Sequence, residues 1–203
     1  MTISQTINSG LRRVPTWPVY LLGSLPPLWY FWQGLDGQLG PEPIKTLEHL
    51  VGLLALQMLI VTLAVTPLRR FTGINLIRYR RAFGLLAFYY VSFHLAVWLF
   101  LDIGDVSLIW ADIVKRWYIT IGMAAFALLI PLALTSNNWA IRKLGPRRWK
   151  RVHQLGYGAA LLGALHFVIL VKGFQLEPLI YMGLVGLLLL ARIDFKSRKL
   201  AAG

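Results

Sequence analysis

The sequence predicts an all-α membrane protein: a polytopic bundle of about six transmembrane helices with both termini on the cytoplasmic side. The 203 residues are 57% hydrophobic and only 14% charged, a balance that soluble domains rarely show. Several apolar stretches approach the roughly 20 residues that span a bilayer. Basic residues also concentrate in alternate loops, as the positive-inside rule requires of the cytoplasmic side.

The apolar stretches consume most of the chain, so we expect one transmembrane domain over residues 1–203. They lie near 15–34, 48–67, 82–101, 117–136, 152–171 and 177–194. Prolines should kink or shorten the first helix, while its tryptophans and tyrosines suit the membrane interfaces. Residues 102–116 are predicted as an external loop that can form a short surface helix, and residues 139–151 as a basic internal loop.

The net charge of +13 is explained by topology rather than by nucleic-acid binding. Seventeen of the 21 lysines and arginines fall in one alternate set of loops and tails, and seven of the eight acids fall in the other set. The basic side is therefore predicted to face the cytoplasm and its anionic lipid headgroups. Arg12 and Arg13 precede an apolar run that is too long for a signal peptide, so we expect a retained anchor.

The chain contains no cysteine, which limits its redox chemistry. Disulfides, cysteine-ligated iron–sulfur clusters and the C-x-x-C-H attachment of c-type haem are excluded. Any haem must therefore be held by other ligands, without a covalent link.

Two histidines lie at nearly equal depth in different predicted helices. Counted from the cytoplasmic ends, His94 lies roughly 18 Å up its helix and His166 roughly 21 Å up its own. Ionisable residues within a membrane usually have a function, although a single one is often only a hydrogen-bonded packing residue. Imidazoles at one level can bind one iron from opposite faces of a porphyrin, so the pair predicts a b-type haem site.

Small residues precede both histidines at helical spacing. Gly84, Ala87 and Val91 share a face with His94, and Gly156, Ala159 and Gly163 share one with His166. Such faces leave room for a flat macrocycle, but they also let helices pack closely without any cofactor.

The other two histidines have less definite roles. His153 lies at the cytoplasmic mouth, about 20 Å below His166, and no histidine stands at Arg80 or Arg81, where a partner for a second haem would be needed. His153 is therefore predicted either as a ligand of a second haem with a non-histidine partner, or as a contact of a propionate, a flavin or a quinone. His49 can be a propionate contact, an alternative ligand or an interface residue, and the last is favoured.

Arginines gather at the predicted inner mouth. Arg80, Arg81 and Arg148 can hold carboxylates or a flavin phosphate, because guanidinium binds both groups bidentately. For most of these arginines, the topology signal is a sufficient explanation.

An ordered set of short motifs resembles the MsrQ (YedZ) family. The motifs are His49–Gly52, Leu63–Leu68, Arg80–Leu85, His94–Leu95, Leu134–Asn137, Leu144–His153, His166 and Leu179–Tyr181. Together they extend from about residue 44 to residue 190. Residues 1–40 match only as an apolar segment.

The resemblance implies a ferric-reductase-like transmembrane domain in the inner membrane of a Gram-negative bacterium. It implies b haem and FMN as cofactors, with His94, His153 and His166 as the haem histidines. It implies electrons from the quinone pool or a cytosolic flavin reductase, and delivery to MsrP, a periplasmic molybdopterin enzyme that reduces methionine sulfoxide in proteins. The chain is expected to be an electron-transfer subunit rather than a complete enzyme.

Two other functions are compatible with the sequence. A quinol-oxidising or ferric-reducing cytochrome would carry the same haem and serve another acceptor. A small transporter or proton relay would use the histidines as titrating groups and show no haem absorbance, but such relays usually employ intramembrane carboxylates, which are scarce here.

Overall fold

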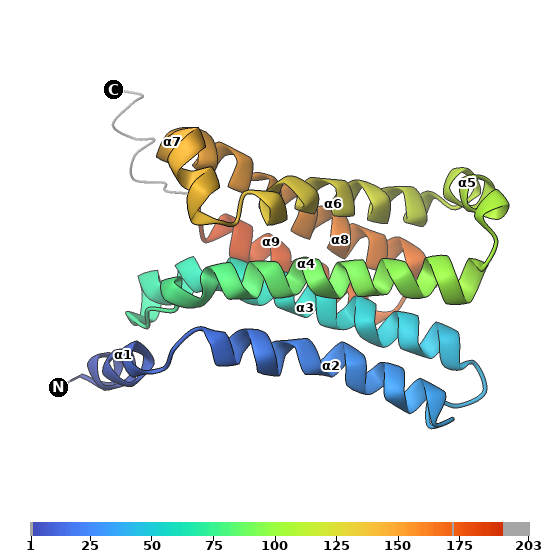
Figure 1. Ribbon diagram of the computed structural model, residues 1–203, viewed down its shortest axis with the longest axis horizontal. Coiled ribbons are helices and arrows are strands. Elements are labelled where there is room, and N and C mark those ends of the chain that lie inside the picture. Colours follow the sequence, from blue (N-terminus) through green and yellow to red (C-terminus); the bar gives the residue numbers. More distant parts are fainter. Residues whose placement is uncertain (1, 172, 193–203) are drawn as a thin grey trace.

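A computed structural model describes residues 2–171 and 173–192, and all regular secondary structure in this part of the chain is helical. Figure 1 shows long helices lying side by side, with short helices across both ends. The helices are α1 (Ile3–Arg13), α2 (Trp17–Leu35), α3 (Pro43–Thr72), α4 (Arg80–Val97), α5 (Val106–Lys115), α6 (Trp117–Leu134), α7 (Asn138–His153), α8 (Leu155–Leu170) and α9 (Leu176–Leu190). A 3-10 turn precedes α4, and a π-helical turn (Trp98–Ile103) extends it.

The predicted membrane bundle is confirmed. Four segments of the described chain are long and apolar enough to cross a membrane: Pro43–Thr72, Ile77–Ile103, Trp117–Leu134 and Asn138–Leu170. Helix α9 is apolar but shorter, and α2 packs against α3 and α4. Each of the six apolar stretches thus corresponds to a helix. Ala159, Ala160 and Ala164 of α8 are fully buried, because small side chains let its neighbours approach closely.

Prolines shape α2 without breaking it. Pro26 and Pro27 lie inside a continuous helix of 19 residues, although their sequence predicts a kinked or shortened one. Because Pro27 has no N–H, the carbonyl of Gly23 loses its usual helical donor. The hydroxyl of Tyr90 in α4 donates to that carbonyl instead. The helix therefore stays regular because a neighbouring helix replaces the missing hydrogen bond.

A second replacement of a missing helical hydrogen bond joins the end of α9 to α3. Pro67 removes the helical donor to the carbonyl of Leu63, and the guanidinium of Arg192 donates to that oxygen. Arg192 also donates to the hydroxyl of Tyr157 in α8 (2.9 Å). One arginine thus connects the end of α9 to two other helices.

The two ends of the bundle differ. At one end, here called the α7 end, α1 crosses the bundle, and Asn8 joins it to Gly73 and Asn75 in the α3–α4 connection. Helix α7, which the sequence predicts as a loop, occupies the same end and turns sharply at Gly145 (φ 72°). The opposite end, here called the α5 end, carries the short helix predicted as possible within residues 102–116.

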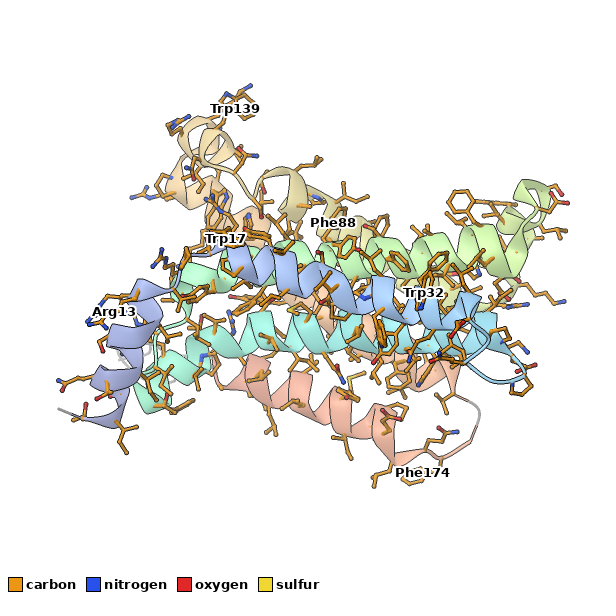
Figure 2. The ribbon with its side chains drawn as sticks, turned by 60° about the horizontal axis from the view of Figure 1, so that its bottom comes forward. Arg13, Trp17, Trp32, Phe88, Trp139 and Phe174 are labelled. Atoms are coloured by element: carbon orange, nitrogen blue, oxygen red, sulfur yellow. The ribbon has the colours of Figure 1, made fainter. Side chains whose placement is uncertain are left out.

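Exposed aromatic residues mark both ends. Figure 2 shows Trp17 and Trp32 at opposite ends of α2, with Trp139 near the α7 end and Phe174 near the α5 end. All four are more than half exposed. Aromatic side chains favour the two membrane–water interfaces, so this arrangement fits a bundle that lies across a bilayer.

Candidate functional site

A cavity of about 400 Å³ runs from the α5 end toward the middle of the bundle. Its volume falls within the roughly 300–1,000 Å³ that cofactor sites occupy. Helices α3, α4, α6 and α8 supply most of its wall, which is apolar toward the middle and polar at the mouth. The polar lining comprises Lys45, Glu48, His49, His94, Asp102, Arg116, Tyr118 and His166.

His94 and His166 lie together in this cavity. The centroids of their rings are 6.3 Å apart, and the ring planes are inclined by 79°. His94 comes from α4 and His166 from α8, and the two residues are 72 positions apart in the sequence. The level placement predicted from counting residues therefore corresponds to two rings that face each other.

Each imidazole is oriented by a backbone carbonyl of a neighbouring helix. Nδ1 of His94 donates to the carbonyl of Glu48 in α3 (2.9 Å), and Nδ1 of His166 donates to the carbonyl of Tyr118 in α6 (2.6 Å). A carbonyl oxygen can only accept, so Nδ1 carries the proton in both rings. In a neutral imidazole, Nε2 then keeps its lone pair and can bind a metal.

The separation of the two rings fits a single metal ion held between them. A metal–imidazole bond is about 2 Å long, and a ring nitrogen lies roughly 1 Å from the centre of its ring, so two axial imidazoles place their centroids about 6 Å apart. The described residues contain no group of three or more His, Cys, Asp and Glu side chains that could hold a bare metal ion. Two nitrogen ligands suffice for a haem iron, because the porphyrin supplies the other four.

A buried donor in the wall of the cavity lacks a partner. Trp98 lies one helical turn beyond His94 toward the α5 end, and its indole N–H makes no hydrogen bond. An indole N–H can only donate, and leaving a buried donor unpaired is costly. A carboxylate at the rim of a bound macrocycle would satisfy it. The cations at the mouth are already partnered, Lys45 with Glu42 and Arg116 with Asp112.

The predicted small-residue faces contribute only in part to the cavity. Val91, Ala159 and Gly163 line it, as do the two histidines. Gly84 instead faces Thr62, and Gly156 faces Leu132. Gly84 and Gly156, which lie nearer the α7 end, therefore serve helix packing. Packing was the alternative explanation of these small-residue patterns.

His153 occupies a different environment at the α7 end. Its ring stacks on Trp149 with centroids 3.9 Å apart, and its Nε2 is 3.2 Å from the hydroxyl of Thr135. Arg80 and Arg81 lie within electrostatic range of the ring. In the part of the chain that the structure describes, no second histidine faces it.

The remaining predicted site residues are dispersed. Arg81 donates to the side chain of Asn138 (2.8 Å), and Arg148 is exposed on α7. Arg80 interacts with Tyr157. His49 is exposed at the mouth of the cavity, with its ring 5.7 Å from that of Phe167. Of these residues, only His49 contributes to the cavity that contains the histidine pair.

Sequence reasoning missed three residues around this pair. Trp98 stands four residues after His94, and this spacing places both side chains on one helix face. The spacing is visible in the sequence. Gly52 in α3 and Gly122 in α6 lie against the two imidazoles, although neither helix carries one of the paired histidines. No periodic pattern marks these glycines, because their role depends on which helices become neighbours.

Comparisons with known proteins agree with this fold. Residues 49–164 match the family described as the ferric reductase like transmembrane component. No solved structure matches the chain. The site and the fold together thus define a membrane component of the ferric-reductase class.

Curated relatives identify the family more closely. The chain is 54% identical over 190 residues to the protein-methionine-sulfoxide reductase heme-binding subunit MsrQ of Brucella anthropi, covering 93% of this chain and 85% of the relative. It is 55% identical over 178 residues to the MsrQ proteins of Brucella ovis and Brucella abortus, covering 87% of this chain and 80% of each relative. The chain belongs to the MsrQ family of heme-binding subunits.

Proposed function

We propose that the chain holds one b-type haem between His94 and His166 and carries electrons through the membrane. The observation that supports this most strongly is the facing pair of rings, 6.3 Å apart, each with Nδ1 bound to a carbonyl. When bound, the haem iron supplies one-electron oxidation and reduction. Two protein ligands leave it no open position, which favours electron transfer over oxygen chemistry.

The chain's own residues orient and enclose the cofactor. The carbonyls of Glu48 and Tyr118 hold the imidazole tautomers that present Nε2. The unpaired indole N–H of Trp98 would donate to a carboxylate of the bound porphyrin. Apolar residues, among them Leu56, Leu59 and Leu129, line the deeper wall of the cavity. They exclude water and lower the local polarity, and both effects tune the potential of a redox centre.

The electrons are proposed to leave at the α5 end. The cavity opens there, and the basic α7 end is assigned to the cytoplasm by the positive-inside rule, with both termini on that side of the bacterial inner membrane. Figure 1 shows α1 and the C-terminal end of α9 at the same end of the bundle, where Arg70 of α3 donates to the carbonyl of Ala191. This arrangement supports placing both of these helix ends on the cytoplasmic side. The single domain over residues 1–203 is part of the same proposal.

The proposed acceptor is MsrP, the periplasmic molybdopterin enzyme that repairs oxidised methionine in proteins. The MsrQ relatives are named as subunits of a protein-methionine-sulfoxide reductase, which supports this assignment. The proposed donor is the quinone pool or a cytosolic flavin reductase. FMN is proposed as a second cofactor, with Arg80, Arg81 and Arg148 as phosphate contacts and His153 as an electron-input residue.

Reconstitution in sealed vesicles tests this function. Purified protein should show a haem spectrum that a quinol, or a flavin reductase with its reductant, reduces from the α7 side. Adding MsrP and a methionine sulfoxide substrate on the other side should reoxidise the haem and yield methionine.

A second acceptor is tested in parallel, because the family match is to the ferric reductase class. Ferric chelate replaces MsrP on the same side of the vesicles. Reoxidation by ferric chelate but not by MsrP would replace the proposed acceptor with iron. A purified protein without haem absorbance would contradict the electron-transfer function itself.

A further inference from the structure

We propose that Gly52 and Gly122 are positioning residues for the two iron ligands: each lets an imidazole lie against a helix so that its Nδ1–H reaches a backbone carbonyl. The inference rests on the proposed haem function and deepens it. It assigns the orientation of the ligands to two residues that bind nothing themselves.

The two contacts have the same construction. His94 bonds to the carbonyl of Glu48, and Gly52 follows four residues later in α3. His166 bonds to the carbonyl of Tyr118, and Gly122 follows four residues later in α6. In an α-helix the residue at i+4 lies one turn above residue i, next to its carbonyl. The glycine therefore stands where a side chain would cover the acceptor.

A side chain at either position would crowd the adjacent imidazole. A Cβ at residue 52 would lie 3.0 Å from Cε1 and 3.1 Å from Nδ1 of His94. A Cβ at residue 122 would lie 2.9 Å from Nδ1 and 3.1 Å from Cε1 of His166. Carbon atoms pack at about 3.5–4.0 Å, so a methyl group would push each ring away from its carbonyl. Because a carbonyl oxygen has two lone pairs, it can accept the imidazole in addition to its helical donor.

Glycines elsewhere in the same helix pairs do not have this relation to a ring. A Cβ at Gly158 in α8 would meet Leu128 of α6 at 3.2 Å, which is similar crowding against an apolar side chain. A Cβ at Gly84 in α4 would lie 4.0 Å from Thr62, an ordinary contact. These two positions separate an effect on helix packing from an effect on the histidines.

The hydrogen bond affects both the angle and the basicity of each ligand. It fixes each ring, and the two planes are inclined by 79°. Near-perpendicular imidazoles give low-spin ferric haem a highly anisotropic EPR signal, so rotation of either ring changes the largest g value. Donation from Nδ1–H also raises the basicity of Nε2 and favours the ferric state. Weakening that bond should raise the midpoint potential.

The test compares haem-loaded Gly52→Ala and Gly122→Ala with Gly158→Ala and Gly84→Ala in the full chain. The first two variants should show a shifted largest g value and a more positive midpoint potential. The two controls should keep the wild-type signal and potential. Unchanged values in both Gly52→Ala and Gly122→Ala, or equal shifts in the controls, would overturn the positioning role.

A ligand-replacement experiment remains decisive if the alanine variants bind no haem. His94→Gly is supplied with imidazole or with 1-methylimidazole, which ligates iron but has no N–H to donate. Imidazole should restore a midpoint potential near that of the wild type, whereas 1-methylimidazole should give a more positive one. Equal potentials would refute the hydrogen-bond role and leave the haem function intact. A wild-type haem spectrum in His94→Gly without either additive would instead contradict the proposed function.

Discussion

The two ends of the bundle use histidine differently. At the α5 end, His94 and His166 face each other, each bonded through Nδ1 to a carbonyl and each with Nε2 available. At the α7 end, the Nε2 of His153 is next to the hydroxyl of Thr135, and its ring stacks on Trp149. The presence of a histidine within a membrane therefore does not by itself indicate a metal ligand. The hydrogen bonds of both ring nitrogens must also be known. The α5 end has the features of an iron site, and the α7 end those of a polar surface contact.

The largest expected effect separates the two ends by haem content. His94→Ala and His166→Ala should each lose most of the bound haem, because one remaining imidazole leaves an axial position unfilled. His49→Ala is the matched control, since it removes an imidazole at the mouth of the same cavity. Absorbance per mole of purified protein measures the difference. Normal haem content in either ligand variant would refute the pairing.

His153→Ala should change electron input more than haem content. Its ring contacts Trp149 and Thr135 and lies at the opposite end from the cavity. The variant should keep the spectrum of the main haem while reduction from the α7 side becomes slower. Stopped-flow reduction by quinol or flavin reductase measures this rate. An unchanged rate and an unchanged haem content would leave His153 a packing residue.

Much of this difference between the ends was predictable from the sequence. Counting residues along helices placed His94 and His166 at one level, because helical rise depends on length alone. Charge in the loops predicted which end is basic. The helices α1 and α7 were not predicted, because short polar helices lack the apolar length that marks a membrane span.

The contacts of the site were not predictable in the same way. Gly52, Gly122 and Trp98 act through neighbours from other helices, and a single sequence does not reveal which faces meet. The continuity of α2 was not predictable for the same reason, because it depends on a hydrogen bond from Tyr90 in another helix.

Trp98→Phe should weaken haem retention without changing the ligands. The substitution keeps the aromatic bulk and removes the unpaired indole donor. Loss of one hydrogen bond to a carboxylate costs about 1.5 kcal/mol or more, which is roughly tenfold in affinity. Haem transfer to an acceptor protein measures the affinity. Trp110→Phe, at an exposed position of α5, is the control and should have no effect.

The smallest expected effect concerns the cap of α5. The side chain of Asp105 accepts hydrogen bonds from the hydroxyl and the amide of Ser107, which hold the pKa of this carboxyl below its usual value. The charged cap therefore stabilises α5 at neutral pH, and this contribution is lost as the pH falls through the lowered pKa.

Hydrogen exchange of the α5 amides checks this prediction. Asp105→Ala should exchange faster at neutral pH. Asp105→Asn, which keeps an acceptor, should retain protection that no longer varies with acid pH. Equal exchange in wild type and Asp105→Ala would show that the cap contributes nothing.

The ligation of the haem is tested most directly by near-infrared magnetic circular dichroism of the purified ferric protein, combined with haem-to-protein stoichiometry. We expect one haem per chain with a bis-imidazole signature, which disappears in His94→Ala and in His166→Ala but persists in His153→Ala. A signature that survives both of the first two substitutions, or that vanishes only in His153→Ala, would show that the iron is bound elsewhere.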